Sequence, residues 1–164
     1  MKENRRIRTI STPAESLPPE PGTYTLLLRP QKHTILEVGR LGTFRLEPGL
    51  YAYVGSARGP GGIRARVDRH IRDDKRPHWH IDVFTRECSV ECVCWVVDAE
   101  RLECTWVKFL LKLAGSQAPI SGFGSSDCSS RCPAHLVKLA DGSSACEVER
   151  AIVARTPHSL TFVA

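Results

Sequence analysis

No run of apolar residues in this sequence approaches the length that a membrane-spanning helix requires. The basic start of the chain, MKENRRIRTISTPAESLPPEPG, is not followed by an apolar segment, so the pattern of a secretory signal peptide is missing as well. Internal repeats and low-complexity tracts are also absent. These absences favour a cytoplasmic protein without a membrane partner over a secreted, membrane-spanning or repeat protein.

The cysteine content does not indicate a disulfide framework, because the seven cysteines cannot all pair and cytosolic thiols are normally reduced. Cys128, Cys132 and His135 form a Cys-x3-Cys-x2-His pattern, which supplies only three of the four ligands of a structural zinc site. Residues 88–94 contain three further cysteines that could supply the fourth. A structural zinc site is therefore one alternative, but we favour reduced, partly buried thiols.

The size and composition of the chain fit one globular domain with its own core. The 164 residues are 41% apolar and 25% charged, a balance that argues against wholesale disorder. Residues 1–21 are basic and then rich in proline, which predicts a flexible or extended arm. The domain is therefore expected to occupy residues 22–164.

Apolar periodicity predicts strands and helices in an α+β order. Strands are expected at residues 23–28, 34–38, 43–46, 50–55, 90–97 and 136–139, with a last edge strand at 159–163. Helices are expected at residues 64–72 and 102–113, and Ser144 and Glu147 form a capping-box pattern that opens another helix to about residue 155. Gly39 to Gly42 predict a hairpin turn. This order predicts a central, mainly antiparallel sheet flanked by helices.

Positive charge is concentrated around the helix expected at residues 64–72. Residues 56–76 hold seven basic and three acidic side chains, and therefore four of the five net positive charges of the chain. Ile63, Val67 and Ile71 recur every four residues and predict the apolar stripe of this helix. Such a basic segment favours a polyanionic partner, although a solvated helix face with ion pairs would have the same composition.

The segment before this helix could approach a phosphate group. Tyr51 and Tyr53 lie two apart on the expected strand 50–55, so their side chains share one face, where tyrosines are more often packing residues than catalytic ones. The strand leads into the glycine-rich sequence GSARGPGG, whose backbone N–H groups could bind an anion. The Gly-Lys-Ser/Thr ending of an ATP-binding loop is missing, which argues against that use.

Three further residues have chemistry that suits phosphate transfer. Arg66 and His70 lie four apart on one helix face, where an arginine could hold a phosphate through two hydrogen bonds and a histidine could exchange a proton. Glu103 stands in the first turn of the expected helix 102–113. It either complements the helix dipole or binds a metal ion such as Mg²⁺, which commonly takes only one or two protein carboxylates.

The segment HWHID at residues 78–82 is a second dense group of polar side chains. In a strand, His78, His80 and Asp82 would share one face, whereas in a helix only His78 and Asp82 would lie together. The sequence leaves both arrangements open.

In combination these residues resemble the GIY-YIG nuclease superfamily, and more closely a small branch of it that is sometimes fused to endonuclease III. The resemblance extends over residues 21–139 and rests on an ordered set of residues: Gly22-Thr23-Tyr24, Tyr53-Val54-Gly55-Ser56, Arg66 with His70, and Glu103. The features that match the branch are PGLYAYVGSA, HWHID, Glu103-Cys104 and GFGSSDC.

The resemblance implies a small α+β domain that hydrolyses DNA phosphodiester bonds with one divalent metal ion, Mg²⁺ or Mn²⁺. By position, Tyr24 and Tyr53 match the two motif tyrosines, and Arg66 matches the arginine that contacts the scissile phosphate. His70 matches a histidine found in some restriction-enzyme members, and Glu103 matches the metal-binding glutamate. Either a tyrosine or His70 could act as the general base. These side chains should lie together in the folded protein.

The expected function is therefore a metal-dependent endonuclease that acts on DNA in repair or restriction, with RNA as an alternative substrate. A non-catalytic nucleic-acid-binding module of the same fold is the alternative function, and a repair protein is a candidate partner. In both cases Tyr51 is a packing or supporting residue. The residues expected to contact nucleic acid are Gly55, Ser56, Arg58, Arg64, Arg69, His78 and His80.

Overall fold

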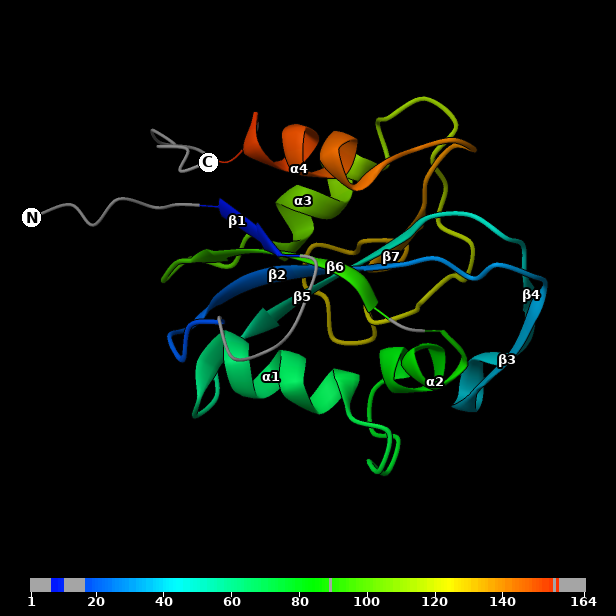
Figure 1. The fold of residues 1–164 in the computed structure, drawn as a ribbon, viewed down its shortest axis with the longest axis horizontal. Coiled ribbons are helices and arrows are strands. Elements are labelled where there is room, and N and C mark those ends of the chain that lie inside the picture. Colours follow the sequence, from blue (N-terminus) through cyan, green and yellow to red (C-terminus); the bar gives the residue numbers. More distant parts are fainter. Residues whose placement is uncertain (1–6, 11–16, 89, 155, 157–164) are drawn as a thin grey trace, which may run out of the picture.

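A five-stranded antiparallel sheet forms the centre of the computed structural model, which describes residues 7–10, 17–88, 90–154 and 156 (Figure 1). The strand order is β1-β6-β2-β5-β7. The strands are β1 (Ile7–Ile10), β2 (Gly22–Leu28), β5 (Tyr51–Ala57), β6 (Val90–Val97) and β7 (Leu136–Lys138). Every neighbouring pair is antiparallel, which confirms the predicted α+β class with a central antiparallel sheet.

Helices cover both faces of the sheet. Figure 1 shows α1 (Gly62–Ile71) and α2 (His80–Glu87) on one side, and α3 (Glu103–Leu110) and α4 (Ala145–Val153) on the other. β2 (GTYTLLL) is consequently buried at every position, without the alternation of a strand that has one wet face. None of the helices in the described ranges has the length and apolar character needed to cross a membrane.

The alternation of side chains along the central strands divides the interior into two cores. Leu26 of β2 packs on the α1 and α2 side together with Val67 and Phe84. Its neighbour Leu27 packs on the α3 and α4 side together with Trp106. The catalytic candidates Tyr24 and Tyr53 lie on the same face as Leu26.

A separate hairpin stands beside α2. β3 (Thr34–Val38) and β4 (Gly42–Leu46) pair antiparallel and are joined by the 3-10 turn η2 (Gly39–Leu41), as the glycines predicted. Both turn glycines have positive φ values, 44° and 106°, which other residues adopt with difficulty. Leu36 and Val38 of β3 are fully buried in the core on the α1 and α2 side.

Three local predictions need correction. Residues 7–10, expected in a flexible or extended arm outside the domain, form β1 and pair with β6 at the sheet edge, and Leu17 is only 1% exposed. Ile71 was expected in the buried stripe of α1 but is 41% exposed, because α1 ends at this residue. The helix expected at 102–113 is shorter, Glu103–Leu110. The predicted edge strand 159–163 lies outside the described residues.

Candidate active site

The two candidate tyrosines project from neighbouring central strands onto the α1 side of the sheet. In the pairing of β2 with β5, Tyr24 stands opposite Gly55 and Leu26 stands opposite Tyr53. A Cβ atom on Gly55 would lie 2.5 Å from the Tyr24 Oη atom. Gly55 is therefore needed to make room for the Tyr24 ring, which explains this glycine better than an exposed anion-binding position does. Tyr24 is 1% exposed and Tyr53 7%.

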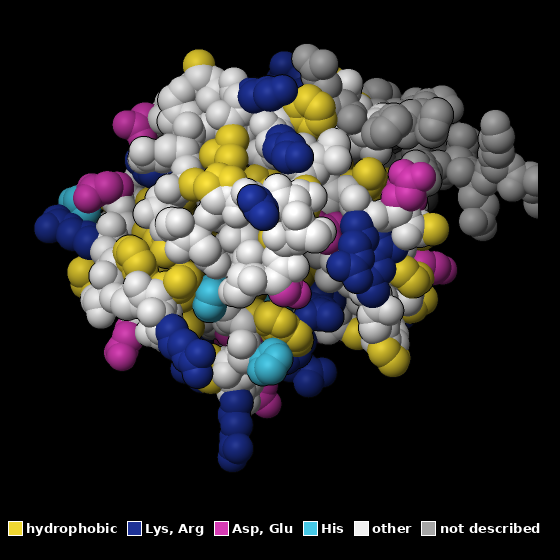
Figure 2. Space-filling model, turned by 180° about the vertical axis from the view of Figure 1, so that it is seen from behind, with side chains coloured by type: hydrophobic (Ala, Val, Ile, Leu, Met, Phe, Trp, Pro, Cys, Tyr) yellow, Lys and Arg dark blue, Asp and Glu magenta, His cyan; other side chains and the backbone are white. Residues whose placement is uncertain are grey.

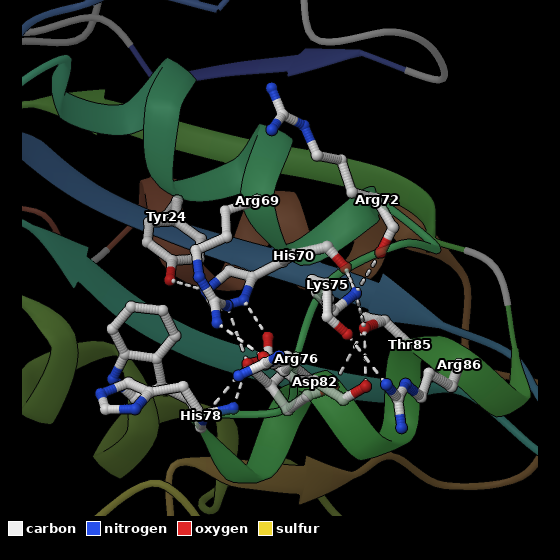
Figure 3. Close-up of polar contacts among 12 residues, drawn as sticks. Tyr24, Arg69, His70, Arg72, Lys75, Arg76, His78, Asp82, Thr85 and Arg86 are labelled. Atoms are coloured by element: carbon white, nitrogen blue, oxygen red, sulfur yellow. Dashed lines mark hydrogen bonds and ion pairs between the residues drawn. The ribbon is translucent and has the colours of Figure 1, made fainter.

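His70 links Tyr24 to an acidic partner on α2. The Tyr24 Oη atom lies 2.8 Å from His70 Nε2, and His70 Nδ1 lies 3.0 Å from Asp82 Oδ1 (Figure 3). An ionised carboxylate can only accept hydrogen bonds, so Nδ1 carries the proton and donates it to Asp82. Nε2 is then the acceptor for the Tyr24 hydroxyl. The three side chains form one chain of hydrogen bonds across β2, α1 and α2.

The start of α2 holds Asp82 as a charged group. Asp82 Oδ2 accepts the backbone N–H groups of His78 at 2.9 Å and Trp79 at 3.0 Å, and Arg69 Nη1 donates to the same oxygen at 2.8 Å. Burial would raise the pKa of Asp82, but the hydrogen bonds from His70, Trp79 and Arg69 outweigh it and lower the pKa far below its usual value. Asp82 is therefore an anion that fixes the orientation of His70.

Burial keeps the other two members of this chain neutral. It raises the pKa of Tyr24 well above its usual value of 10.0, and nearby Tyr53 raises it further. The pKa of His70 is lowered below 6.5, mainly by burial, although Asp82 opposes the shift. At neutral pH a neutral phenol therefore donates to a neutral imidazole. That imidazole can accept a proton, whereas a Tyr24 phenolate is not accessible in this environment.

Arg66 is placed as a cation next to the tyrosines. Its guanidinium lies 4.3 Å from the centre of the Trp79 ring, and the Arg69 guanidinium stacks on the same ring at the same distance. The charge of Arg66 lowers the pKa values of Tyr24 and Tyr53 against the larger effect of burial. Within the described ranges no carboxylate pairs with Arg66, so its hydrogen-bond donors remain available to an anion.

Glu103 belongs to the opposite helix layer, and its charge affects both tyrosines. It lies in the first turn of α3 and is 8% exposed, and its Oε2 atom has no hydrogen-bond partner among the described residues. Its negative charge raises the pKa values of Tyr24 and Tyr53, after burial and other groups. A buried carboxylate oxygen without a partner is costly unless a cation binds it, so Glu103 fits a divalent metal ion.

Several residues expected to contact nucleic acid are engaged by the protein itself. Arg58 donates to the carbonyls of Asp98, Ala99 and Glu100 and so ties the end of β5 to the end of β6. Arg64 donates to the carbonyl of Leu17 at 2.7 Å. The basic segment 56–76 therefore contributes fewer free cations than its composition indicated.

Lys75 is another basic side chain of this segment that is not free. It is buried and donates to the carbonyls of His70 and Arg72 and to Thr85 Oγ1 (Figure 3). Its ammonium group therefore caps the C-terminal end of α1 and joins this helix to α2. Arg72 and Arg76 are exposed. Figure 2 shows Lys and Arg side chains on the back of the molecule, including its lower half, the level of α1 and α2 in Figure 1.

The HWHID segment leads into α2 and forms its first turn, rather than a strand. His78 is exposed and its ring packs edge-on against Trp79, with the ring centres 4.6 Å apart. His80 is half-buried, and its Nδ1 accepts the Gly124 N–H at 3.0 Å. Ser56, at the end of β5, is half-buried. His78 is thus the histidine of this segment that a nucleic acid could reach directly.

A second group of polar side chains lies next to Glu103. Cys104, Cys128, Cys132 and His135 place one potential ligand atom each within 4.8 Å of one another and could hold a metal ion. The fourth member is thus Cys104, which the sequence analysis had not assigned. The predicted source of a fourth ligand, residues 88–94, is wrong, because none of its three cysteines belongs to the group of converging ligand atoms among the described residues.

Sequence reasoning missed the roles of Asp82 and Trp79. The sequence left a strand and a helix open for the HWHID segment, and only the fold shows that Asp82 faces His70. The prediction for Tyr51 was correct. It is a packing residue that is 1% exposed, contacts Phe84 edge-on and donates its hydroxyl to the Glu47 carbonyl at 2.8 Å.

One comparison with known families gave a result that covers most of the chain. A family model described as "Domain of unknown function DUF123" matches residues 23–156. No curated protein and no solved structure matches the chain. The matched range includes all five catalytic candidates as well as the Cys/His group.

Proposed function

We propose that this chain, which belongs to the DUF123 family, is a metal-dependent endonuclease of the GIY-YIG type that hydrolyses DNA phosphodiester bonds. One observation carries the proposal. Tyr24 is hydrogen-bonded to His70, and the Tyr53 ring contacts His70 edge-on. The charges of Arg66 and Glu103 both shift the pKa values of the two tyrosines, although the five residues come from four different elements. Packing alone does not require a tyrosine–histidine–aspartate chain, an arginine without a carboxylate partner and a buried unpartnered glutamate oxygen in one place.

The hydrogen-bond chain supplies a route for the proton of the attacking water. The water gives its proton to Tyr24 Oη while the phenolic proton moves to His70 Nε2, which leaves hydroxide to attack phosphorus and an imidazolium beside Asp82. The Asp82 carboxylate stabilises that imidazolium. This route needs no phenolate, which the raised pKa of Tyr24 disfavours. His70 is therefore the general base and Tyr24 is the group that relays the proton to it.

Arg66 acts on the phosphate itself. Its guanidinium can donate two hydrogen bonds to the nonbridging oxygens, whose negative charge increases as the attacking oxygen approaches phosphorus. Stacking on Trp79 fixes the plane of the guanidinium before the substrate binds. Tyr53, whose ring contacts His70 edge-on, closes the site on the β5 side.

Glu103 would hold the divalent ion, Mg²⁺ or Mn²⁺. Its unpartnered Oε2 atom offers one carboxylate ligand, which suffices where water and phosphate oxygens complete the shell. When bound, such an ion polarises a phosphate oxygen and neutralises the leaving alkoxide. The protein's own residues then position the phosphate and accept the proton.

The alternative function is a non-catalytic nucleic-acid-binding module. The burial of the proton relay favours it, because Tyr24 and His70 are each 1% exposed in this structure. Catalysis requires a substrate-bound state in which water reaches Tyr24 Oη. In the alternative, the relay is a structural network and only the exposed cations contact the nucleic acid.

Cleavage assays separate the two functions. The protein is incubated with duplex, nicked and branched DNA, and with RNA, in the presence of Mg²⁺ or Mn²⁺. We expect metal-dependent cleavage of a DNA substrate that Glu103→Gln reduces by at least about 100-fold, because the variant keeps the shape but loses the charged ligand. Glu100→Gln, a change on an exposed turn nearby, is the matched control and should cleave normally. Salt-dependent binding without cleavage of any substrate would favour the non-catalytic module.

A further inference from the structure

The group formed by Cys104, Cys128, Cys132 and His135 is not used by the proposed chemistry. Cys104 and Cys128 are half-buried, and Cys132 and His135 are each 7% exposed. The Cys104 Sγ atom lies 3.4 Å from Cys128 Sγ and 4.0 Å from His135 Nε2. Three sulfur atoms and one imidazole nitrogen therefore converge on one point, although the chain brings them from two separate segments.

From this convergence we propose that the protein binds one structural Zn²⁺ ion through Cys104, Cys128, Cys132 and His135. A tetrahedral site with Zn–S bonds of about 2.3 Å separates its sulfur atoms by roughly 3.8 Å. The four ligand atoms already lie within 4.8 Å of one another, so small side-chain rotations complete the shell. Thiolate and imidazole ligands select Zn²⁺ over the hard cations Mg²⁺ and Ca²⁺.

The ion binds as the three thiols release their protons to solvent, and neutral His135 supplies a nitrogen lone pair. Four protein ligands fill a tetrahedral shell and leave no position for water or substrate, so the site is structural rather than catalytic. The distance between Cys104 and Cys128 does not indicate a disulfide, whose sulfur atoms lie about 2.05 Å apart.

The backbone around the site explains why a metal ion is needed there. Between α3 and β7 the chain runs from Leu111 to His135 without a helix or strand of its own. Successive tight turns lead into the site, such as the Cys128 N–H to the Ser125 carbonyl at 3.1 Å, and Arg131 has a left-handed φ of 52° just before Cys132. A loop of this length is unusual in a compact domain, and zinc would tie it to the first turn of α3.

The site also determines the position of Glu103, because the neighbouring residue Cys104 is a ligand in the same helical turn. Zinc would hold this turn against the loop that carries Gly124, whose missing side chain makes room for the Tyr53 ring. The idea that zinc positions residues of the active site rests on the proposed function, whereas the zinc site itself does not.

Metal analysis of the purified wild-type protein tests the site. The protein is expressed without added zinc and measured by inductively coupled plasma mass spectrometry. We expect about one zinc per chain, and on exchange with Co²⁺ the visible absorption of tetrahedral, thiolate-bound cobalt. Chelation should lower the melting temperature. A folded protein with no zinc, no such cobalt spectrum and an unchanged melting temperature would overturn the proposal, as would a Cys104–Cys128 disulfide found by mass spectrometry.

Variants assign the ligands and separate this site from the nuclease. Cys132→Ser should lose zinc and the cobalt spectrum, and the matched control Cys146→Ser, an exposed cysteine on α4, should keep both. Glu103→Gln should keep its zinc although it is expected to lose cleavage. If the protein binds one zinc per chain but cleaves no substrate, the zinc site is supported and only the nuclease proposal is contradicted. Normal zinc content in Cys132→Ser would show that Cys132 is not a zinc ligand.

Discussion

The Tyr24 hydroxyl donates to His70 Nε2 at 2.8 Å across 46 positions of sequence, and this hydrogen bond joins the central strand β2 to helix α1. It exists because Asp82 forces the proton of His70 onto Nδ1. A phenol, an imidazole and a carboxylate in this order form a hydrogen-bond chain whose direction is set by the carboxylate, and in the proposed function this chain relays a proton.

Replacing Asp82 with asparagine should invert the tautomer of His70. The asparagine amide can donate to Nδ1, which leaves Nε2 carrying the proton and unable to accept from Tyr24. We expect DNA cleavage to fall by about 10²–10⁴-fold, with binding much less affected. Circular dichroism must first show that Asp82→Asn is folded, since Arg69 loses its charged partner. An unchanged cleavage rate in a folded variant would remove the relay from the mechanism.

The burial of neutral His70 should make stability depend on pH. Because the pKa of His70 is lower in the folded than in the unfolded protein, its contribution is fully present above the unfolded value of about 6.5 and is lost as the pH falls towards the folded value. The melting temperature should therefore decrease from pH 7.5 to 5.5. His70→Gln should flatten this slope in part, because burial also lowers the pKa of His80. Identical slopes in both proteins would contradict the assignment.

Gly55 should be intolerant of even one methyl group. A Cβ atom there would meet Tyr24 Oη at 2.5 Å and Cζ at 2.6 Å, within the central sheet where neither strand can move easily. We expect Gly55→Ala to lower the free energy of unfolding by about 1–3 kcal/mol, measured by urea denaturation. Gly59→Ala is the matched control, since nothing lies within 4 Å of its Cβ position. Equal stability of the two variants would show that Tyr24 is not packed as described.

DNA cleavage should depend on the guanidinium group of Arg66 and not only on its positive charge. The variant Arg66→Lys keeps the positive charge. It lacks the planar guanidinium, which can hold two phosphate oxygens and stacks on Trp79. We expect cleavage to decrease by about 10²–10³-fold, with a small change in the salt dependence of DNA binding. Arg72→Lys, on the exposed end of the same helix, should behave as wild type. A comparable loss in both variants would point to general charge rather than to a specific phosphate contact.

Local sequence patterns determined most of the elements. The apolar runs placed β2 and β6 correctly, Gly39 and Gly42 marked the hairpin turn, and the Ser144–Glu147 pair opened α4 as a capping box. Each of these signals arises from residues within a few positions of one another. The sequence placed residues 7–10 in a flexible or extended arm and did not predict β1, since a strand at a sheet edge depends on its partner β6 rather than on its own composition.

The sequence by itself also supplied the inventory of the site, because tyrosine, arginine, histidine, glutamate and cysteine carry their chemistry wherever they stand. Only the tertiary structure decided which groups meet. It joined Asp82 to His70, engaged Arg58 with three backbone carbonyls and brought Cys104 to Cys128 across 24 positions. Residue spacing can place side chains on one face of an element, but contacts between elements depend on how the sheet and helices pack.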